Sequence, residues 1–159
     1  MPFAMRPEDL SFPERAGVRL GFSRLLPAPP ERVFDVLADH EGWARWFPDF
    51  REAVVTSPER EGTGTRRRVS VGPMVLDERF LAWERGRRFA FTMVATRLPI
   101  VSAMVEDWRM EPAEGGTRLS YAVGIDVPGW VRPFTGLLLR KFRPLFERAL
   151  PALEERLRA

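Results

Sequence analysis

The stretch of sequence that decides the fold is FRPLFERALPALEERL, residues 142–157. Its apolar residues recur at steps of three and four, which places them in one continuous stripe on a helix. Pro144 and Pro151 do not suit the interior of a straight helix, because proline lacks a backbone N–H and clashes with the preceding turn. We therefore predict one long helix over residues 130–159, bent or broken near Pro144, that lies on a broad apolar surface.

The composition indicates one globular domain without metal or disulfide chemistry. The 159 residues are 45% hydrophobic and 30% charged, with no cysteine and a single histidine, His40. A lone histidine cannot build a histidine cluster, and we expect neither a metal site nor a cofactor. Because we find no 18-residue apolar run and no signal peptide pattern, we expect a cytoplasmic protein. Acidic residues are mixed among the arginines throughout, so we do not expect nucleic-acid binding.

Upstream of the helix, the chain reads mainly as strands. Residues 1–16 show no clear period, so we expect an irregular N-terminal arm, followed by a single domain over residues 17–159. Residues 18–23 alternate as a first strand, and two short helices follow, the second capped by Asp39. Six further strand segments are separated by turn signals, at residues 53–56, 65–71, 74–83, 89–96, 101–111 and 117–127. Hairpin-length connections predict an α+β fold, with a curved, seven-stranded antiparallel sheet around the C-terminal helix.

Three short motifs fall within this order of elements. They are PAPPERVFDVLAD at residues 27–39, WFP at residues 46–48 and GGTRLSY at residues 115–121. With them, the chain resembles the START-like superfamily, also called SRPBCC, and within it the polyketide cyclase/dehydrase-like group. The resemblance implies a helix-grip fold, in which a seven-stranded sheet holds a C-terminal helix over a deep apolar cavity. Members bind lipids, quinones, polyketides or other apolar ligands, and some are enzymes, so the fold alone does not choose the function.

Period-two alternation assigns the strand side chains to two faces. A turn around residues 113–116 places Trp108 opposite Tyr121, and the three preceding hairpins give a mainly apolar face in the same register. A one-residue slip in any hairpin would break this agreement. The predicted inner face holds Arg67, Val69, Leu76, Glu78, Phe80, Phe91, Met93, Met104, Glu106, Trp108, Tyr121 and Val123.

Arg67, Glu78 and Glu106 are charged, and a charge on an apolar face is costly unless it is paired or reached by water. One interpretation is that Arg67 and Glu78 form a structural ion pair and that Glu106 lies near a water-filled mouth. The other is that these groups meet the polar part of a ligand. Glu78 and Glu106 are separated by one strand, about 10 Å at a spacing of ~4.8 Å, which is too far to share a proton.

Two further side chains bear on acid–base chemistry. Tyr121, the only tyrosine, needs a hydrogen-bond partner if it is buried, and Glu106 is its near neighbour. Burial against aromatic rings would raise the pKa of Glu106 and suit it to act as an acid or base. We expect His40 to be a surface residue or a helix-end group, so it does not assist Glu106.

We predict a non-enzymatic protein that binds, and thereby transports or sequesters, a mostly apolar small molecule such as a lipid, quinone or polyketide. We assign no catalytic residue. One alternative is an aromatase/cyclase-type enzyme for an aromatic polyketide, with Glu106, Tyr121 or Arg67 as acid, base or orienting group. Another alternative is a protein-interaction module. The candidate ligand-binding residues are Trp46, Arg67, Glu78, Phe80, Phe91, Met93, Met104, Glu106, Trp108, Tyr121, Val123, Leu138 and Phe142.

Residues 129–143, just before Pro144, are apolar on nearly all sides. A helix can bury only part of such a surface against a sheet, so the remainder faces a ligand, a partner or a membrane surface. One hypothesis is that this segment is a gate that swings at Gly136 and Pro144 and transiently contacts anionic lipid headgroups near Trp130. The alternative is a fully packed core helix with a harmless bend.

Overall fold

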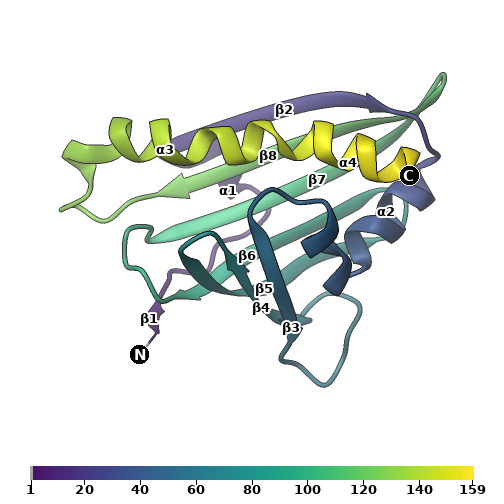
Figure 1. Cartoon of the computed structure of the whole chain (residues 1–159). Coiled ribbons are helices and arrows are strands. Elements are labelled where there is room, and N and C mark those ends of the chain that lie inside the picture. The colour runs from purple at the N-terminus through teal and green to yellow at the C-terminus, as the bar shows by residue number, and fades with distance from the viewer. Residues whose placement is uncertain (1) are drawn as a thin grey trace.

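The computed structural model describes residues 2–159, which form an antiparallel sheet curved around a C-terminal helical segment (Figure 1). The strands are β1 (Phe3–Ala4), β2 (Val18–Leu26), β3 (Phe50–Val55), β4 (Arg66–Val71), β5 (Met74–Glu84), β6 (Arg88–Thr96), β7 (Ala103–Ala113) and β8 (Gly116–Asp126). The α-helices are α1 (Phe12–Arg15), α2 (Pro30–Ala38), α3 (Thr135–Glu147) and α4 (Ala149–Arg158), and the 3₁₀ helices are η1 (Glu41–Arg45) and η2 (Arg132–Phe134). The seven strands run in the order β2-β8-β7-β6-β5-β4-β3, and the short β1 pairs with β6. The predicted helix-grip architecture is confirmed.

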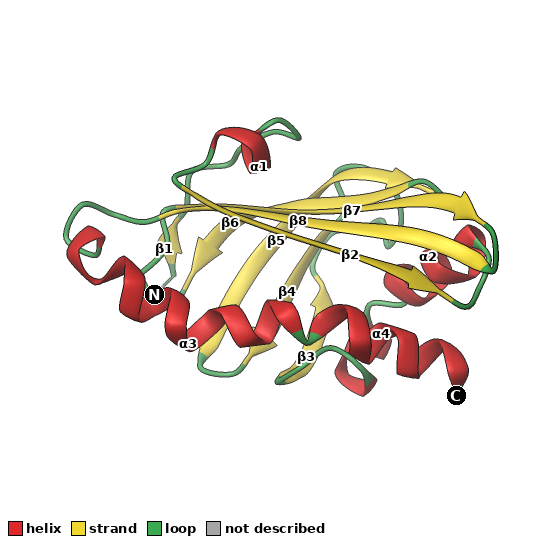
Figure 2. Cartoon of the chain, turned by 90° about the horizontal axis from the view of Figure 1, so that it is seen from above, coloured by secondary structure: helices red, strands yellow, loops and turns green. Residues whose placement is uncertain are grey.

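The two faces of the sheet are covered by different segments. Helices α3 and α4 lie end to end along one face, which we call the inner face, and α1 lies against the other (Figure 2). On that outer face, Phe12 and Ala16 pack with Ala103 and Val105 of β7. The alternation of β7 therefore sends these two small residues outward and its larger apolar residues toward α3 and α4.

The N-terminal arm is mostly irregular but contains two short elements that the sequence analysis did not predict, since residues 3–4 pair with β6 and residues 12–15 form α1. A strand of two residues and a helix of four are too short to leave a periodic pattern in the sequence. Gly124 on β8 lets the arm lie close to the sheet: a Cβ atom there would come within 2.8 Å of the Pro13 Cα atom. The arm is thus packed on the domain rather than attached loosely to it.

The C-terminal helix is interrupted at Arg148, between α3 and α4. Pro144 lies inside α3, where its missing N–H leaves one helical hydrogen bond unmade. The interruption places Pro151 in the first turn of α4, where backbone N–H groups have no partner within the helix in any case. The C-terminal helix is broken as predicted, but at Arg148 rather than at Pro144, which α3 accommodates. Helices α3 and α4 remain nearly collinear (Figure 1).

The predicted strand register is also confirmed. Trp108 lies opposite Tyr121 in the β7–β8 hairpin, and Arg67 lies opposite Glu78 in the β4–β5 hairpin. The β5–β6 hairpin contains two register shifts, yet it keeps Glu78 opposite Met93 as predicted. Because the hairpins agree, all the predicted inner-face residues lie on the face that carries the core.

Candidate functional site

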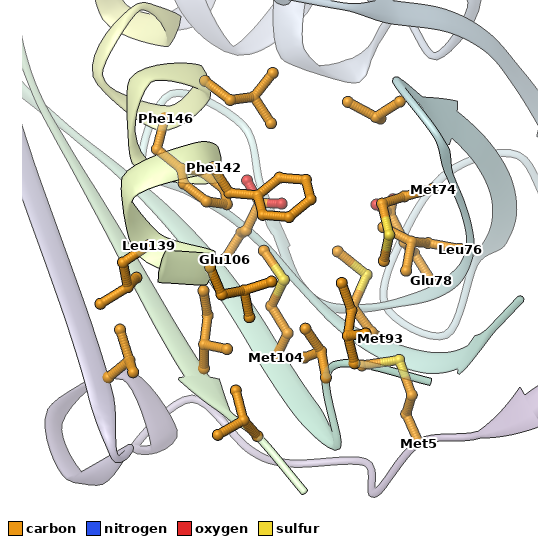
Figure 3. Close-up of a pocket in the computed structure, with 18 of the residues that line it drawn as sticks. Met5, Met74, Leu76, Glu78, Met93, Met104, Glu106, Leu139, Phe142 and Phe146 are labelled. Carbon is orange, nitrogen blue, oxygen red and sulfur yellow. The ribbon is translucent and has the colours of Figure 1, made fainter. Parts of the chain in front are cut away.

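A cavity of about 90 Å³ lies between α3 and the inner face of the sheet. Its wall is almost entirely apolar and includes Met5, Met74, Met93 and Met104 (Figure 3). Methionine is unbranched and flexible, so such a wall can adapt to ligands of irregular shape. From the helix, the wall receives Thr135, Leu138, Leu139, Phe142, Leu145 and Phe146.

The thirteen residues predicted to bind a ligand divide into two groups. Seven line the cavity: Glu78, Phe91, Met93, Met104, Glu106, Leu138 and Phe142. Six are buried in the surrounding core without forming the wall: Trp46, Arg67, Phe80, Trp108, Tyr121 and Val123. The second group lies toward the end of the sheet where η1 and α2 fill the space with aromatic rings, which alternation along a strand cannot reveal.

Several wall residues were not among the predicted ligand-binding residues. They are Met5 from the arm, Phe47 just after η1, and Ile100 and Val101 from the β6–β7 connection. Val101 began the predicted strand 101–111, but β7 starts at Ala103. Loop residues follow no period, so only the closed fold shows which of them face inward.

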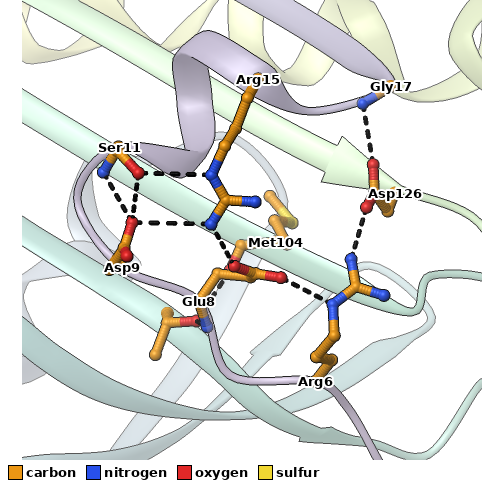
Figure 4. A network of polar contacts seen from close by, with 9 residues as sticks. Arg6, Glu8, Asp9, Ser11, Arg15, Gly17, Met104 and Asp126 are labelled. Atoms are coloured by element: carbon orange, nitrogen blue, oxygen red, sulfur yellow. Dashed lines mark hydrogen bonds and ion pairs between the residues drawn. The ribbon is translucent and has the colours of Figure 1, made fainter.

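A network of ion pairs holds the arm that carries Met5 (Figure 4). The Arg6 guanidinium lies 2.6 Å from Glu8 and 2.5 Å from Asp126, at the end of β8. The Gly17 N–H donates to Asp126 over 2.8 Å. Arg15 of α1 also contacts Glu8, at 2.6 Å. The arm is therefore attached at both ends of its path, which keeps Met5 in the wall.

Arg67 is fully buried beside the cavity. Its guanidinium carbon lies 4.7 Å from the ring centre of Trp43 and 5.1 Å from those of Phe80 and Phe91. Its Nε donates to a Glu78 oxygen over 2.6 Å. A guanidinium keeps its proton in proteins, so it needs a counter-charge in this apolar place. Glu78 supplies this negative charge, and the faces of the aromatic rings add cation–π contacts. The predicted structural ion pair is confirmed.

His40 completes the environment of Arg67. It is only 2% exposed, so its expected surface position is wrong, although it does lie at the start of η1. Its Nδ1 faces an Arg67 nitrogen at 3.4 Å, and its Nε2 lies 2.8 Å from the Arg60 carbonyl. Arginine can only donate, so Nδ1 accepts and Nε2 carries the proton. Burial lowers the pKa of His40, which keeps the ring neutral beside the cation.

Glu106 is a buried carboxyl group on the cavity wall, 5% exposed, so its predicted place near a water-filled mouth is wrong. The Tyr121 hydroxyl donates to its Oε1, as the sequence suggested. The Tyr121 ring in turn stacks on Trp108, with 3.8 Å between ring centres. Burial, with a further contribution from Glu78, raises the pKa of Glu106 to about 8. Glu106 is therefore mostly protonated at neutral pH.

Burial also raises the pKa of Glu78, while the charge of Arg67 opposes this shift. Because Arg67 is cationic and buried, we assign the negative charge of the pair to Glu78. The wall thus combines a paired carboxylate with a neutral carboxylic acid, on strands β5 and β7. The negative charge of Glu78 raises the pKa of Glu106, although strand β6 lies between the two residues. This arrangement agrees with the predicted separation of the two residues by one strand.

The raised pKa of Glu106 predicts a specific pH dependence of stability. The pKa of Glu106 in the folded protein, about 8, exceeds its ordinary value of 4.5. The protonated carboxyl group therefore stabilises the fold fully below pH 4.5, and this stabilisation is lost as the pH rises through 8. In urea unfolding experiments, the free energy of unfolding of the wild type relative to Glu106→Gln should fall by up to about 1.4 kcal/mol per pH unit across this window. His40 is present in both proteins, so its opposite effect cancels. A constant difference from pH 4.5 to 8 would contradict the prediction.

Comparison with known families assigns the chain. Residues 18–158 match the family described as polyketide cyclase / dehydrase and lipid transport. The chain belongs to this family. Its START-like membership, first suggested by three motifs, is confirmed, and the family supports a ligand-binding or cyclase-like role. The family description names no single substrate, so it does not decide between the two roles.

Known relatives and solved structures agree with this family and its fold. An uncharacterized protein of Mycobacterium tuberculosis is 38% identical over 142 residues, which cover 89% of this chain and 83% of that protein. A START superfamily protein from Mycobacterium smegmatis has a TM-score of 0.70 at 16% identity, covering 89% of this chain and 99% of that one. The ZhuI aromatase/cyclase from Streptomyces sp. R1128 has a TM-score of 0.66 at 21% identity, covering 89% and 96%. The two structures show a shared fold.

Proposed function

We propose that the protein binds a mostly apolar small molecule, such as a lipid, quinone or polyketide, between α3 and the sheet, for transport or sequestration. The observation that carries the proposal is an apolar cavity wall with two buried carboxyl groups. Small-molecule sites have this composition, because apolar surface supplies affinity and a few polar groups fix orientation. The family description, which includes lipid transport, supports the same function.

The size of the cavity indicates that α3 moves when such a ligand enters. A volume of about 90 Å³ is well below the roughly 300–1,000 Å³ of ordinary ligand sites. Within α3, only Phe146 is fully buried, whereas α4 buries Ala149, Leu150, Leu153 and Leu157. We therefore infer that α3 is a gate that lifts at the interruption near Arg148, while α4 stays packed.

Hydrogen exchange tests this gate. Amides of residues 131–143 should exchange at least about tenfold faster than those of residues 149–157, because local opening exposes only the first group. Adding Nile red, an uncharged apolar dye, should slow exchange in residues 131–143 and increase the dye's fluorescence. Equal protection on both sides of Arg148, unchanged by the dye, would contradict the gate. Native mass spectrometry of the purified protein would then identify any ligand that copurifies.

A second candidate function is cyclisation or dehydration of an aromatic polyketide. The observation that favours it is the protonated Glu106 on the cavity wall, hydrogen-bonded to Tyr121, because a neutral carboxylic acid can donate a proton to a reacting carbonyl. The fold shared with an aromatase/cyclase is compatible with this role. A Glu106→Gln variant that binds a polyketide as tightly as the wild type but no longer converts it would support the enzyme. A ligand recovered from the wild type with unchanged mass, chromatographic retention and absorption spectrum would support binding alone, because cyclisation without dehydration leaves the mass the same.

The outer side of the gate suits transient contact with an anionic membrane surface. Trp130, Phe134 and Leu137 are 63%, 59% and 68% exposed. The sequence between Val127 and Phe146 contains four basic residues and no acidic one. Exposed apolar side chains beside basic ones favour the interface of anionic lipids, where each basic residue contributes about 1 kcal/mol.

Vesicle binding tests this contact. The protein should sediment with vesicles that contain phosphatidylglycerol and not with phosphatidylcholine vesicles, and a Trp130→Ala/Phe134→Ala variant should lose at least about tenfold in affinity. Leu25→Ala, which removes an exposed apolar side chain from β2 far from the gate, is the matched control. Binding that ignores lipid charge, or that survives the double substitution, would contradict this contact.

A further inference from the structure

The ionisable groups on the cavity wall are all of one chemical kind. Among the described wall residues, the ionisable side chains are Glu78 and Glu106, and no basic side chain lines the cavity. Arg67 lies behind the wall, inside its cage of aromatic rings. A ligand that enters the cavity therefore meets carboxyl oxygens rather than a cation.

The remaining N–H and O–H groups of wall side chains are already in use. Trp43 Nε1 donates to the Leu37 carbonyl over 2.7 Å. The Thr135 hydroxyl donates to the Arg132 carbonyl over 2.9 Å. Neither group is free to bind an anionic ligand. Among the described wall residues, the remaining O–H group is that of the protonated Glu106, and there is no basic side chain of the kind with which proteins ordinarily hold carboxylate and phosphate groups.

Each of the two carboxyl groups has one oxygen in use and one without a partner. Glu78 Oε2 accepts from Arg67, and Glu106 Oε1 accepts from Tyr121. Within residues 2–159, no donor reaches Glu78 Oε1 or Glu106 Oε2, although the two residues are only 3% and 5% exposed. Both residues line the cavity, so a bound ligand lies against these oxygens and is favoured if it hydrogen-bonds to them. The Glu78 carboxylate can only accept, so it requires a donor from the ligand, whereas the protonated Glu106 can donate or accept.

We propose that the polar end of the ligand is a hydroxyl or amino group, and that fatty acids and other anionic amphiphiles are excluded. The inference rests on the proposed binding function and narrows its ligand class. A hydroxyl can donate to the Glu78 carboxylate or both donate to and accept from Glu106. An ammonium group would pair with an ionised Glu106. A carboxylate would place a third carboxyl group near Glu78 with no cation to balance it.

Three probes with the same alkyl tail test the head group: decanol below its solubility limit, and decylamine and decanoate below their micellar concentrations, all near pH 7. Displacement of Nile red from the wild-type protein should require at least tenfold lower concentrations of decanol and decylamine than of decanoate. In Glu106→Gln, decylamine should lose at least tenfold in affinity, while decanol changes less than threefold. Glu111→Gln, on the exposed side of β7, is the control and should leave all three unchanged. Thermal melts verify that each variant is folded.

The outcomes separate this inference from the proposed function. If Nile red does not bind at all, the binding function itself fails. If the dye binds and decanoate displaces it as well as or better than the other probes, the assignment of the head group is overturned and the binding function stands. The head-group assignment is likewise overturned if none of the three probes displaces the bound dye. An unchanged affinity of Glu106→Gln for decylamine would overturn the role given to Glu106.

Discussion

Replacing Glu78 by glutamine should destabilise the protein by about 3–5 kcal/mol, the usual effect of removing one partner of a buried ion pair. Arg67 is fully buried, and its Glu78 contact, at 2.6 Å, is its one carboxylate contact among residues 2–159. The substitution would leave a guanidinium with aromatic rings and a neutral imidazole for neighbours. Cation–π contacts contribute about 2 kcal/mol or more each when desolvated, but they are already present in the wild type and cannot replace the lost carboxylate.

The matched control is Asp77→Asn, one residue away on the same strand. Asp77 contacts Arg68 at 2.7 Å, and both side chains reach solvent on the outer face. An exposed pair of this kind contributes about 0–1 kcal/mol. Urea unfolding of both variants measures the contrast. A loss below about 0.5 kcal/mol for Glu78→Gln, the scale of surface substitutions, would show that water reaches Arg67.

The second large effect is expected from Leu153→Ala in α4, a loss of about 2–5 kcal/mol. Leu153 is fully buried against the core that the sheet presents, so its truncation removes apolar contacts and leaves a cavity. Leu137→Ala in α3 makes the same chemical change at a side chain that is 68% exposed. It should alter stability by less than about 0.5 kcal/mol.

Urea unfolding of these two variants compares the free energies of unfolding lost at one position in α4 and one in α3. Both substitutions replace leucine by alanine, so helix propensity changes equally and cancels in the comparison. Equal losses would mean that α3 is anchored as firmly as α4, and the gate would then be untenable. A large loss at Leu153 alone would show that burial in the core makes α4 a stabilising part of the C-terminal segment.

Strand alternation and turn spacing carried enough information to predict the inner face. The turn at residues 113–116 fixed Trp108 opposite Tyr121, and each earlier hairpin had to agree with it to keep one face apolar. The Arg67–Glu78 pair followed from the same register before any contact was known. Period-two patterns are reliable here because every strand has one face on the core.

Features that depend on segments without a period could not be predicted in this way. The β3–β4 connection folds back over His40, so that the Arg60 carbonyl accepts a hydrogen bond from the His40 ring and the ring is buried. The size of the cavity depends on how Phe142 and the methionines pack, since rotamers rather than register decide how much space stays open. Sequence patterns therefore located the inner face and left the dimensions of the site undetermined.

The position of Met5 has a consequence for how relatives of this protein can diverge. The family match begins at residue 18, yet a residue of the preceding arm forms part of the cavity wall. The arm contacts the sheet through the short β1–β6 pairing, backbone hydrogen bonds, ion pairs and α1, and it lies outside the seven-strand order of the sheet, so its side chains can change without disturbing the register of those seven strands. Homologues with the same sheet and C-terminal helix can thus acquire different ligand preferences by exchanging their N-terminal extensions, outside the portion of the chain by which the family is recognised.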